Sequence, residues 1–126
     1  MSVANDKIPA SNLFDQINEQ LANNQAEVKD AIKNGNGIFA FTIKGNSGEV
    51  DSWHVDLKET GRVGKGLGDK PNVTLILGEE DFTKLFLGEA NPQRLFMAGK
   101  LKVKGDIMKA LKLQPILGMV REKAKL

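Results

Sequence analysis

Residues 91–113 read NPQRLFMAGKLKVKGDIMKALKL and predict a short helix, a turn, a strand and a second helix within one stretch. Asn91 is a good helix N-cap, and Pro92 suits the first helical position. Gly99 favours the end of that helix. From Lys100 to Lys104, lysine alternates with an apolar residue, which predicts a strand with one wet face and one apolar face.

The same periodicities, followed outward along the chain, predict the remaining elements of the fold. We expect helices near 11–22, 26–33, 81–86, 92–98 and 106–113, and strands near 38–44, 52–58, 62–66, 73–77 and 100–104. Short hairpin loops imply mostly antiparallel pairing. One apolar face per strand implies that helices cover a single face of the sheet. The predicted fold class is therefore a two-layer α+β domain.

Length and composition indicate one ordinary globular domain. The chain has 126 residues, of which 40% are hydrophobic and 27% charged, and no linker or repeat is visible. It contains no cysteine, which excludes disulfides, thiol nucleophiles and cysteine-based metal sites and agrees with an intracellular protein. No apolar run approaches the length of a membrane span, and the first residues lack the apolar core of a signal peptide.

Charge is unevenly distributed along the chain. From Arg94 onward there are nine Lys or Arg residues and two acidic residues, so this part carries about +7 and the first 93 residues about −5 of the net +2. A basic end suits an anionic partner, such as a phosphate-bearing head group, an acidic membrane surface or nucleic acid, although a solvated lysine face is equally consistent. The basic strand has no exposed aromatic side chains among its lysines, which argues against nucleic-acid binding by stacking.

Catalytic and metal-binding patterns are weak. His54 is the only histidine, lies on the polar face of its strand between Trp53 and Val55, and is interpreted as a surface residue without partners for base or metal chemistry. The acidic residues 79–81 suit the start of a helix. The glycine-rich loop 64–68 lacks the spacing of a phosphate-binding loop. We therefore predict no catalytic residue, no metal, no cofactor and no enzymatic activity.

A long, gap-free block gives this chain a resemblance to a known family. The block consists of Asp81-Phe82, Leu85, Gly88, Asn91-Pro92-Gln93, Phe96, Gly99-Lys100-Leu101-Lys102 and Gly105. It resembles the pattern of the sterol carrier protein type 2 family of lipid-binding domains, particularly its stand-alone fungal peroxisomal members. The resemblance implies a five-stranded, mostly antiparallel sheet with helices on one face enclosing a hydrophobic tunnel. It implies one domain over residues 1–126, with a core of about 11–118 and a C-terminal targeting tail at 119–126.

The resemblance also implies which residues contact a lipid. The implied lining of the tunnel is Phe14, Ile17, Ile32, Phe39, Phe41, Leu101, Val103, Ile107, Met108, Leu111, Gln114 and Leu117, with Gln114 matching a family glutamine near the cavity. An anionic head group could be attracted by Lys100, Lys102 and Lys109, which could equally be solvated. An acyl chain of about a dozen CH₂ groups would gain ~10 kcal/mol on burial, before the costs of ordering it.

The implied function is a lipid carrier. We expect long-chain fatty acids and fatty acyl-CoA as ligands, with phospholipids and sterols also possible, and transient contact with an anionic membrane. The alternative is a non-catalytic module that binds peroxisomal enzymes. The sequence finishes in Ala124, Lys125 and Leu126, a variant of the peroxisomal Ser-Lys-Leu address, which predicts recognition by the import receptor and a peroxisomal location, with some protein in the cytoplasm.

Overall fold

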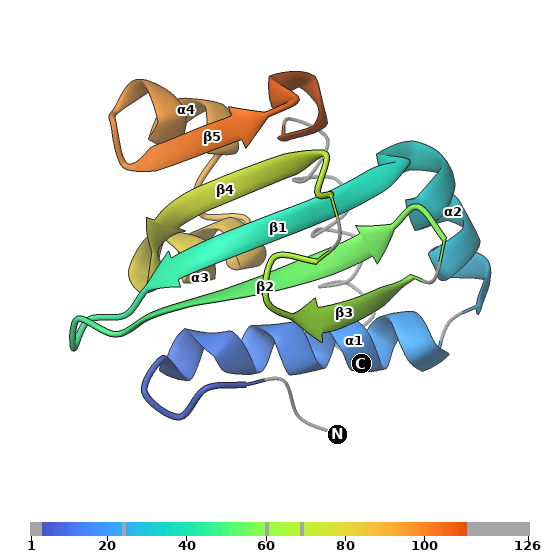
Figure 1. Cartoon of the computed structure of the whole chain (residues 1–126), viewed down its shortest axis with the longest axis horizontal. Helices are drawn as coiled ribbons and strands as arrows, with labels where there is room; N and C mark the ends of the chain where they lie inside the picture. The colour runs from blue at the N-terminus through green and yellow to red at the C-terminus, as the bar shows by residue number, and fades with distance from the viewer. Residues whose placement is uncertain (1–3, 24, 60, 69, 111–126) are drawn as a thin grey trace.

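A five-stranded mixed sheet forms the centre of the protein (Figure 1). The computed structural model describes residues 4–23, 25–59, 61–68 and 70–110. The strands are β1 (Gly37–Lys44), β2 (Val50–Leu57), β3 (Arg62–Lys65), β4 (Val73–Gly78) and β5 (Leu101–Gly105), in the spatial order β3-β2-β1-β4-β5. The predicted five-stranded α+β fold is confirmed, and β1 with β4 is the one parallel pair among these described strands.

Helices lie along one side of the sheet and at its ends. They are η1 (Pro9–Ser11), α1 (Asn12–Asn23), α2 (Gln25–Gly35), α3 (Glu79–Leu87) and α4 (Pro92–Met97), and residues 107–110 are also helical. Figure 1 views the sheet from its uncovered face, with α3 behind it, α1 along the β3 side and α4 beside β5. None of the described helices combines the length and the apolar character needed to cross a membrane.

Strand register divides apolar from polar side chains. Phe41 is opposite Trp53 on β2 and Leu75 on β4, and Leu75 is opposite Val103 on β5, so this row faces the helices. On the other face Thr42 is opposite Ser52, and their hydroxyl oxygens are 3.0 Å apart. The alternation predicted from the sequence therefore sets the two faces of the sheet.

The parallel pair depends on a chain crossing that ends at Asn72. After β3 the chain passes over the uncovered face to reach β4 (Figure 1). The Asn72 side-chain oxygen accepts a hydrogen bond from the Ile38 N–H, and the Asn72 N–H donates to the Ile38 carbonyl, both at 2.9 Å. Gly105 has a φ of +97°, and a Cβ there would lie 2.5 Å from the Asn72 carbonyl oxygen. Asn72 therefore fixes the start of β4 between β1 and the end of β5.

A stack of aromatic rings joins the helices to the sheet. Phe14 on α1 lies between Trp53 and Phe82, with ring centroids 4.9 and 4.7 Å away and nearly parallel planes. Phe41 meets both Phe14 and Phe82 edge-on at 5.6 Å. All four side chains are buried. Stacked and edge-on pairs add to the hydrophobic gain from burial, so this cluster fixes α1, α3, β1 and β2 relative to one another.

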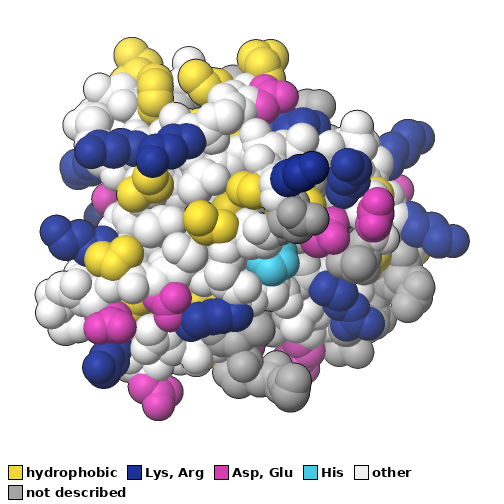
Figure 2. Space-filling view, in the orientation of Figure 1, with side chains coloured by type: hydrophobic (Ala, Val, Ile, Leu, Met, Phe, Trp, Pro, Cys, Tyr) yellow, Lys and Arg dark blue, Asp and Glu magenta, His cyan; other side chains and the backbone are white. Residues whose placement is uncertain are grey.

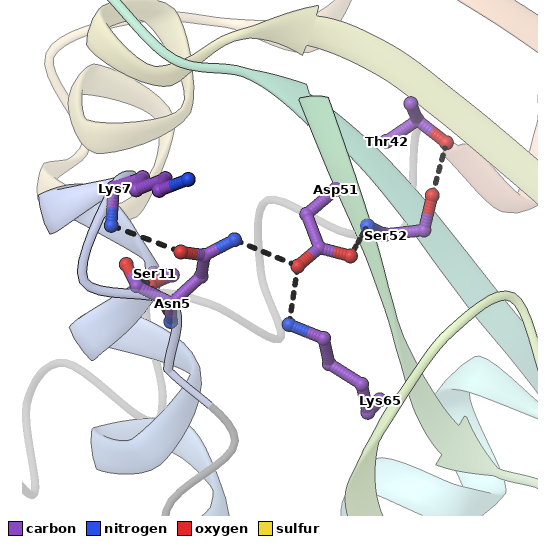
Figure 3. A network of polar contacts seen from close by, with 7 residues as sticks. All are labelled: Asn5, Lys7, Ser11, Thr42, Asp51, Ser52 and Lys65. Atoms are coloured by element: carbon purple, nitrogen blue, oxygen red, sulfur yellow. Dashed lines mark hydrogen bonds and ion pairs between the residues drawn. The ribbon is translucent and has the colours of Figure 1, made fainter. Parts of the chain in front are cut away.

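The N-terminal segment is tied to the sheet by polar contacts around Asp51 (Figure 3). The Asp51 carboxylate accepts hydrogen bonds from the Lys65 ammonium, the Asn5 amide at 2.9 Å and the Ser52 N–H at 2.8 Å. Lys65 also lies 4.6 Å from the centre of the Trp53 ring. Burial raises the pKa of Asp51, but the three hydrogen bonds and the charge of Lys65 outweigh it and hold the pKa below its ordinary value of 3.8.

We expect Phe14→Ala to lower the free energy of unfolding by about 3–5 kcal/mol, because it removes the central ring of the stack and leaves a cavity. Urea denaturation measures the loss. Leu67→Ala is the control, since Leu67 is exposed and its truncation should change stability by no more than about 0.5 kcal/mol. A loss below about 1 kcal/mol for Phe14→Ala would contradict the assigned role of the stack.

We expect Asp51→Asn to reduce the dependence of the free energy of unfolding on pH at acid pH. Because the folded pKa is lowered, the stabilisation is present above the ordinary value and is lost as pH falls through the folded pKa. Between about pH 5 and about pH 3 the parent should lose up to about 1 kcal/mol more than the variant in urea titrations. Asp6→Asn, an exposed carboxylate on the same segment, is the matched control. Parallel profiles for parent and Asp51→Asn would contradict the assignment.

Candidate functional site

An apolar pocket of about 250 Å³ lies between α4, β5 and the helical turn that begins at Ile107. Among the described residues its lining consists of Pro92, Gln93, Phe96, Met97, Leu101, Val103, Ile107 and Ala110. Gln93 is the one polar side chain of this set. Such a lining can hold an apolar chain, and it presents no acid, base or nucleophile to a bound molecule.

The first wall of the pocket is α4, and local signals fix both ends of this short helix. The Asn91 side-chain oxygen caps it by accepting a hydrogen bond from the Gln93 N–H at 2.8 Å, and Pro92 occupies its first turn. Gly99 has a φ of +78°, and the following Lys100 N–H donates to the Leu95 carbonyl at 2.9 Å. This reversal places α4 against β5.

The second wall begins at Asp106, which caps the helical turn after β5. Its carboxylate accepts hydrogen bonds from the N–H groups of Met108 at 3.0 Å and Lys109 at 3.4 Å, and its own N–H donates to the Asn72 carbonyl. The Lys109 ammonium donates to the Asn36 carbonyl at 2.7 Å, just before β1. Together these contacts hold the turn over the apolar face of β5.

The floor of the pocket is the apolar side of β5. Leu101 is buried and Val103 is half-buried, whereas Lys102 and Lys104 are exposed on the opposite side of the strand. Phe96, Met97 and Ile107 line the pocket and are also exposed to solvent. The pocket therefore opens to the protein surface through a rim of apolar side chains.

The structure places some, but not all, of the predicted lipid contacts around this pocket. Leu101, Val103 and Ile107 line it, and Met108 lies beside them with its side chain exposed. Four other predicted lipid contacts are buried in the hydrophobic core: Phe14, Ile17, Phe39 and Phe41. Ile32 is half-buried on α2 against Gly61. The other predicted contacts, Leu111, Gln114 and Leu117, and the targeting residues Ala124, Lys125 and Leu126 lie outside the described residues. The lipid contacts of this whole set stay a prediction.

The three predicted head-group lysines are spread over different surroundings. Lys109 is engaged by the Asn36 carbonyl. Lys102 is exposed on the uncovered side of β5. Lys100 borders a second hollow, of about 500 Å³, between α3 and α4, where Lys84 and Arg94 also lie.

Sequence analysis missed the contribution of α4 to the pocket. Pro92, Gln93, Phe96 and Met97 supply half of its described lining. A usable signal was present: two large apolar residues, Phe96 and Met97, are adjacent, and a helix of six residues cannot bury both against one partner. Of the two, Phe96 belongs to the family pattern given above, and Met97 carries no prediction from the sequence.

Other polar groups fail to form a reaction centre within the described ranges. The His54 ring approaches the Gly66 carbonyl at 3.1 Å through Nδ1, and a Cβ at Gly64 would lie 2.5 Å from its Cε1. The glycine-rich loop thus encloses the imidazole, which is half-buried and more enclosed than the predicted surface histidine. No group of three His, Asp or Glu side chains suited to a metal ion occurs among these residues.

Comparison with known proteins gives a consistent result over nearly the whole chain. The model of the SCP-2 sterol transfer family matches residues 14–118. A fatty acid-binding protein of Yarrowia lipolytica is 44% identical over 123 residues, which cover 93% of this chain and 95% of that protein. An oleate-induced peroxisomal protein of Candida maltosa is 40% identical over 128 residues and all of both chains.

The fold is similarly close to a solved structure. The apo form of sterol carrier protein 2 from Yarrowia lipolytica superposes with a TM-score of 0.86 at 40% sequence identity, and the match covers 93% of this chain and 95% of that one.

Proposed function

Because this chain belongs to the SCP-2 sterol transfer family, we propose that it carries long-chain fatty acids and fatty acyl-CoA inside the cell. The observation that carries the proposal is the apolar pocket between α4 and β5, whose described lining has a single polar side chain. The name of the fatty acid-binding relative supports the same ligand class. Phospholipids and sterols are further ligands that an apolar cavity would accept.

The proposed mechanism is binding without chemistry. Each CH₂ removed from water contributes ~0.8 kcal/mol, so affinity grows with the length of buried chain and selectivity among long chains is weak. The described pocket, at about 250 Å³, lies below the range of about 300–1,000 Å³ typical of ligand sites, so it accommodates only part of a long acyl chain. Leu101, Val103 and Ile107 would contact that part.

The names of the family and of a fungal relative support a non-catalytic role. The family description names sterol transfer, and the fungal relative is named for fatty acid binding. A second candidate function is a module that holds a peroxisomal enzyme in the same apolar pocket, which the exposed rim favours. Lipid that co-purifies with the protein would favour the carrier over the module.

We also propose that the protein works in peroxisomes, with a fraction in the cytoplasm. The support is the oleate-induced peroxisomal relative, which matches over its full length. Ala124, Lys125 and Leu126 would then be recognised by the import receptor. Oleate is a long-chain fatty acid, so the relative's inducer and the proposed ligand belong to one chemical class.

We expect Val103→Asp to abolish binding of a fluorescent long-chain fatty acid, because it places a carboxylate in the floor of the pocket. Titration of the protein with the probe measures binding, and palmitoyl-CoA and cholesterol compete for it at low and high salt. Binding by the parent should be saturable, tolerant of salt and displaced by palmitoyl-CoA.

The matched control is Lys104→Asp, which introduces the same carboxylate one residue further along β5 on the exposed side. It should retain the parent affinity within about threefold. If a folded parent protein fails to bind the probe, the carrier proposal fails and the enzyme-binding module becomes the better-supported hypothesis. Normal binding by a folded Val103→Asp variant would place the lipid elsewhere.

We expect deletion of Leu126 to move a fluorescently tagged protein from puncta to the cytosol, because the receptor reads the terminal leucine. The tag is attached at the N-terminus, and a peroxisomal marker is imaged in the same cells. Lys123→Gln, just upstream of the proposed address, is the control and should remain punctate. Unchanged puncta after the deletion would contradict the assigned address.

A further inference from the structure

Two methionines beside the pocket are the most exposed apolar side chains of the described structure. Met97 retains 78% and Met108 retains 68% of its accessible surface, more than any other large hydrophobic side chain within the described ranges. Figure 2 shows hydrophobic side chains gathered at the α4 end of the molecule. Methionine differs from the aliphatic residues around it because peroxides oxidise its thioether sulfur. The mouth of the pocket therefore carries a reactive group as well as an apolar surface.

The two methionines differ in their relation to the pocket. Met97 is the last residue of α4 and lines the pocket. It stays exposed because this six-residue helix buries Pro92 and Leu95 instead. Met108 follows Ile107 on the turn after β5 and is absent from the described lining. Because both sulfur atoms are open to small solutes and only one borders the pocket, Met108 is an internal control for Met97.

The chain offers peroxide no thiol to react with first. Cysteine thiolates are the usual first targets of oxidation in proteins, but this chain has no cysteine and four methionines. Two of these, Met1 and Met119, lie outside the described residues. Sulfur oxidation in the described part of the chain therefore falls on Met97 and Met108.

We propose that Met97 is a site of reversible oxidation by hydrogen peroxide, and that its sulfoxide lowers the affinity of the pocket for an acyl chain. A lone pair of the Met97 Sδ attacks one peroxide oxygen, and the O–O bond breaks as the S–O bond forms. The departing hydroxide takes the proton of the transferred hydroxyl and becomes water. The sulfur is thus oxidised to the sulfoxide and the peroxide is reduced to water. The inference rests on the proposed carrier function and adds a dependence on oxidant to it.

The effect on binding follows from the change in polarity at the opening. Reduced Met97 presents a flexible apolar surface that adapts to ligands of different shape. Its sulfoxide carries an S=O dipole, which water solvates while the pocket is empty. An acyl chain that covers Met97 displaces this water and offers no hydrogen-bond donor in return. Oxidation therefore favours the empty pocket, and cargo is released where peroxide accumulates.

The test treats the full-length protein with hydrogen peroxide, removes the oxidant with catalase and titrates the protein with the fluorescent fatty acid. Peptide mass spectrometry follows the conversion of each methionine in the same samples. Affinity should fall about tenfold as Met97 is converted, since the buried dipole loses its hydrogen bonds to water. Stereospecific methionine sulfoxide reductases should restore it. Bound fatty acid should slow the conversion of Met97 more than that of Met108.

Matched variants separate the two exposed sulfur atoms. Met97→Leu should bind within about threefold of the parent, because it keeps an apolar side chain of similar volume, and peroxide should not change its affinity. Met108→Leu should lose affinity on oxidation as the parent does. Met97→Gln places a polar side chain at the opening and should bind weakly without peroxide, whereas Met108→Gln should bind as the parent does. Thermal unfolding of each sample confirms that the protein remains folded.

The outcomes distinguish this inference from the carrier function. Unchanged affinity after full conversion of Met97 would overturn the inference and leave the carrier function intact. The same holds if Met97→Leu loses affinity on oxidation as the parent does, because another methionine would then be responsible. A Met97 that resists peroxide in the folded protein would also overturn it. Failure of the untreated parent to bind the probe would contradict the carrier function itself, and the inference would fail with it.

Discussion

Phe14, stacked between Trp53 and Phe82, is the contact on which the arrangement of the two layers depends. Its ring brings together a helix from the start of the chain, a helix from its second half and the centre of the sheet. Ring stacking is more demanding in geometry than aliphatic contact, so it sets the angle of α1 as well as its distance. The apolar pocket lies away from this stack, at the β5 edge of the same sheet.

Much of the fold was predictable because its signals are local. Alternation within Lys100–Lys104 and within β2 predicts strands, and Asn91-Pro92 predicts the start of α4. The parallel pairing of β1 with β4 was not predictable in this way. It depends on a crossing over the uncovered face and on the Asn72 contacts with Ile38, which join residues far apart in sequence. Periodicity reports which face of a strand is apolar, and it carries no information on which strand lies beside it.

In the candidate site, too, only part of the arrangement was predictable from local signals in the sequence. Strand alternation predicted that Leu101 and Val103 share the apolar side of β5, and the family resemblance implied that they contact a lipid; both line the pocket. Phe96 and Met97 were not predicted to line it, because a helix of one and a half turns shows no period. Phe14 and Phe41 were expected along a tunnel by family resemblance; both are buried in the aromatic core, and their contact with a lipid stays a prediction. Apolar character alone does not distinguish a wall of a cavity from a filled interior, since both favour the same side chains.

The floor of the pocket, β5, forms its ladder with β4 alone in the described sheet, whereas β1 is bonded on both sides. Separating β5 from the sheet breaks one ladder and leaves the aromatic stack intact. The free energy of that local opening is therefore smaller than the free energy of global unfolding, and the two are set by different residues. The pocket can thus widen around a bulky cargo at the β5 edge, while the aromatic stack governs the global folding equilibrium. The size of the cargo can then vary without a matching change in the free energy of global unfolding.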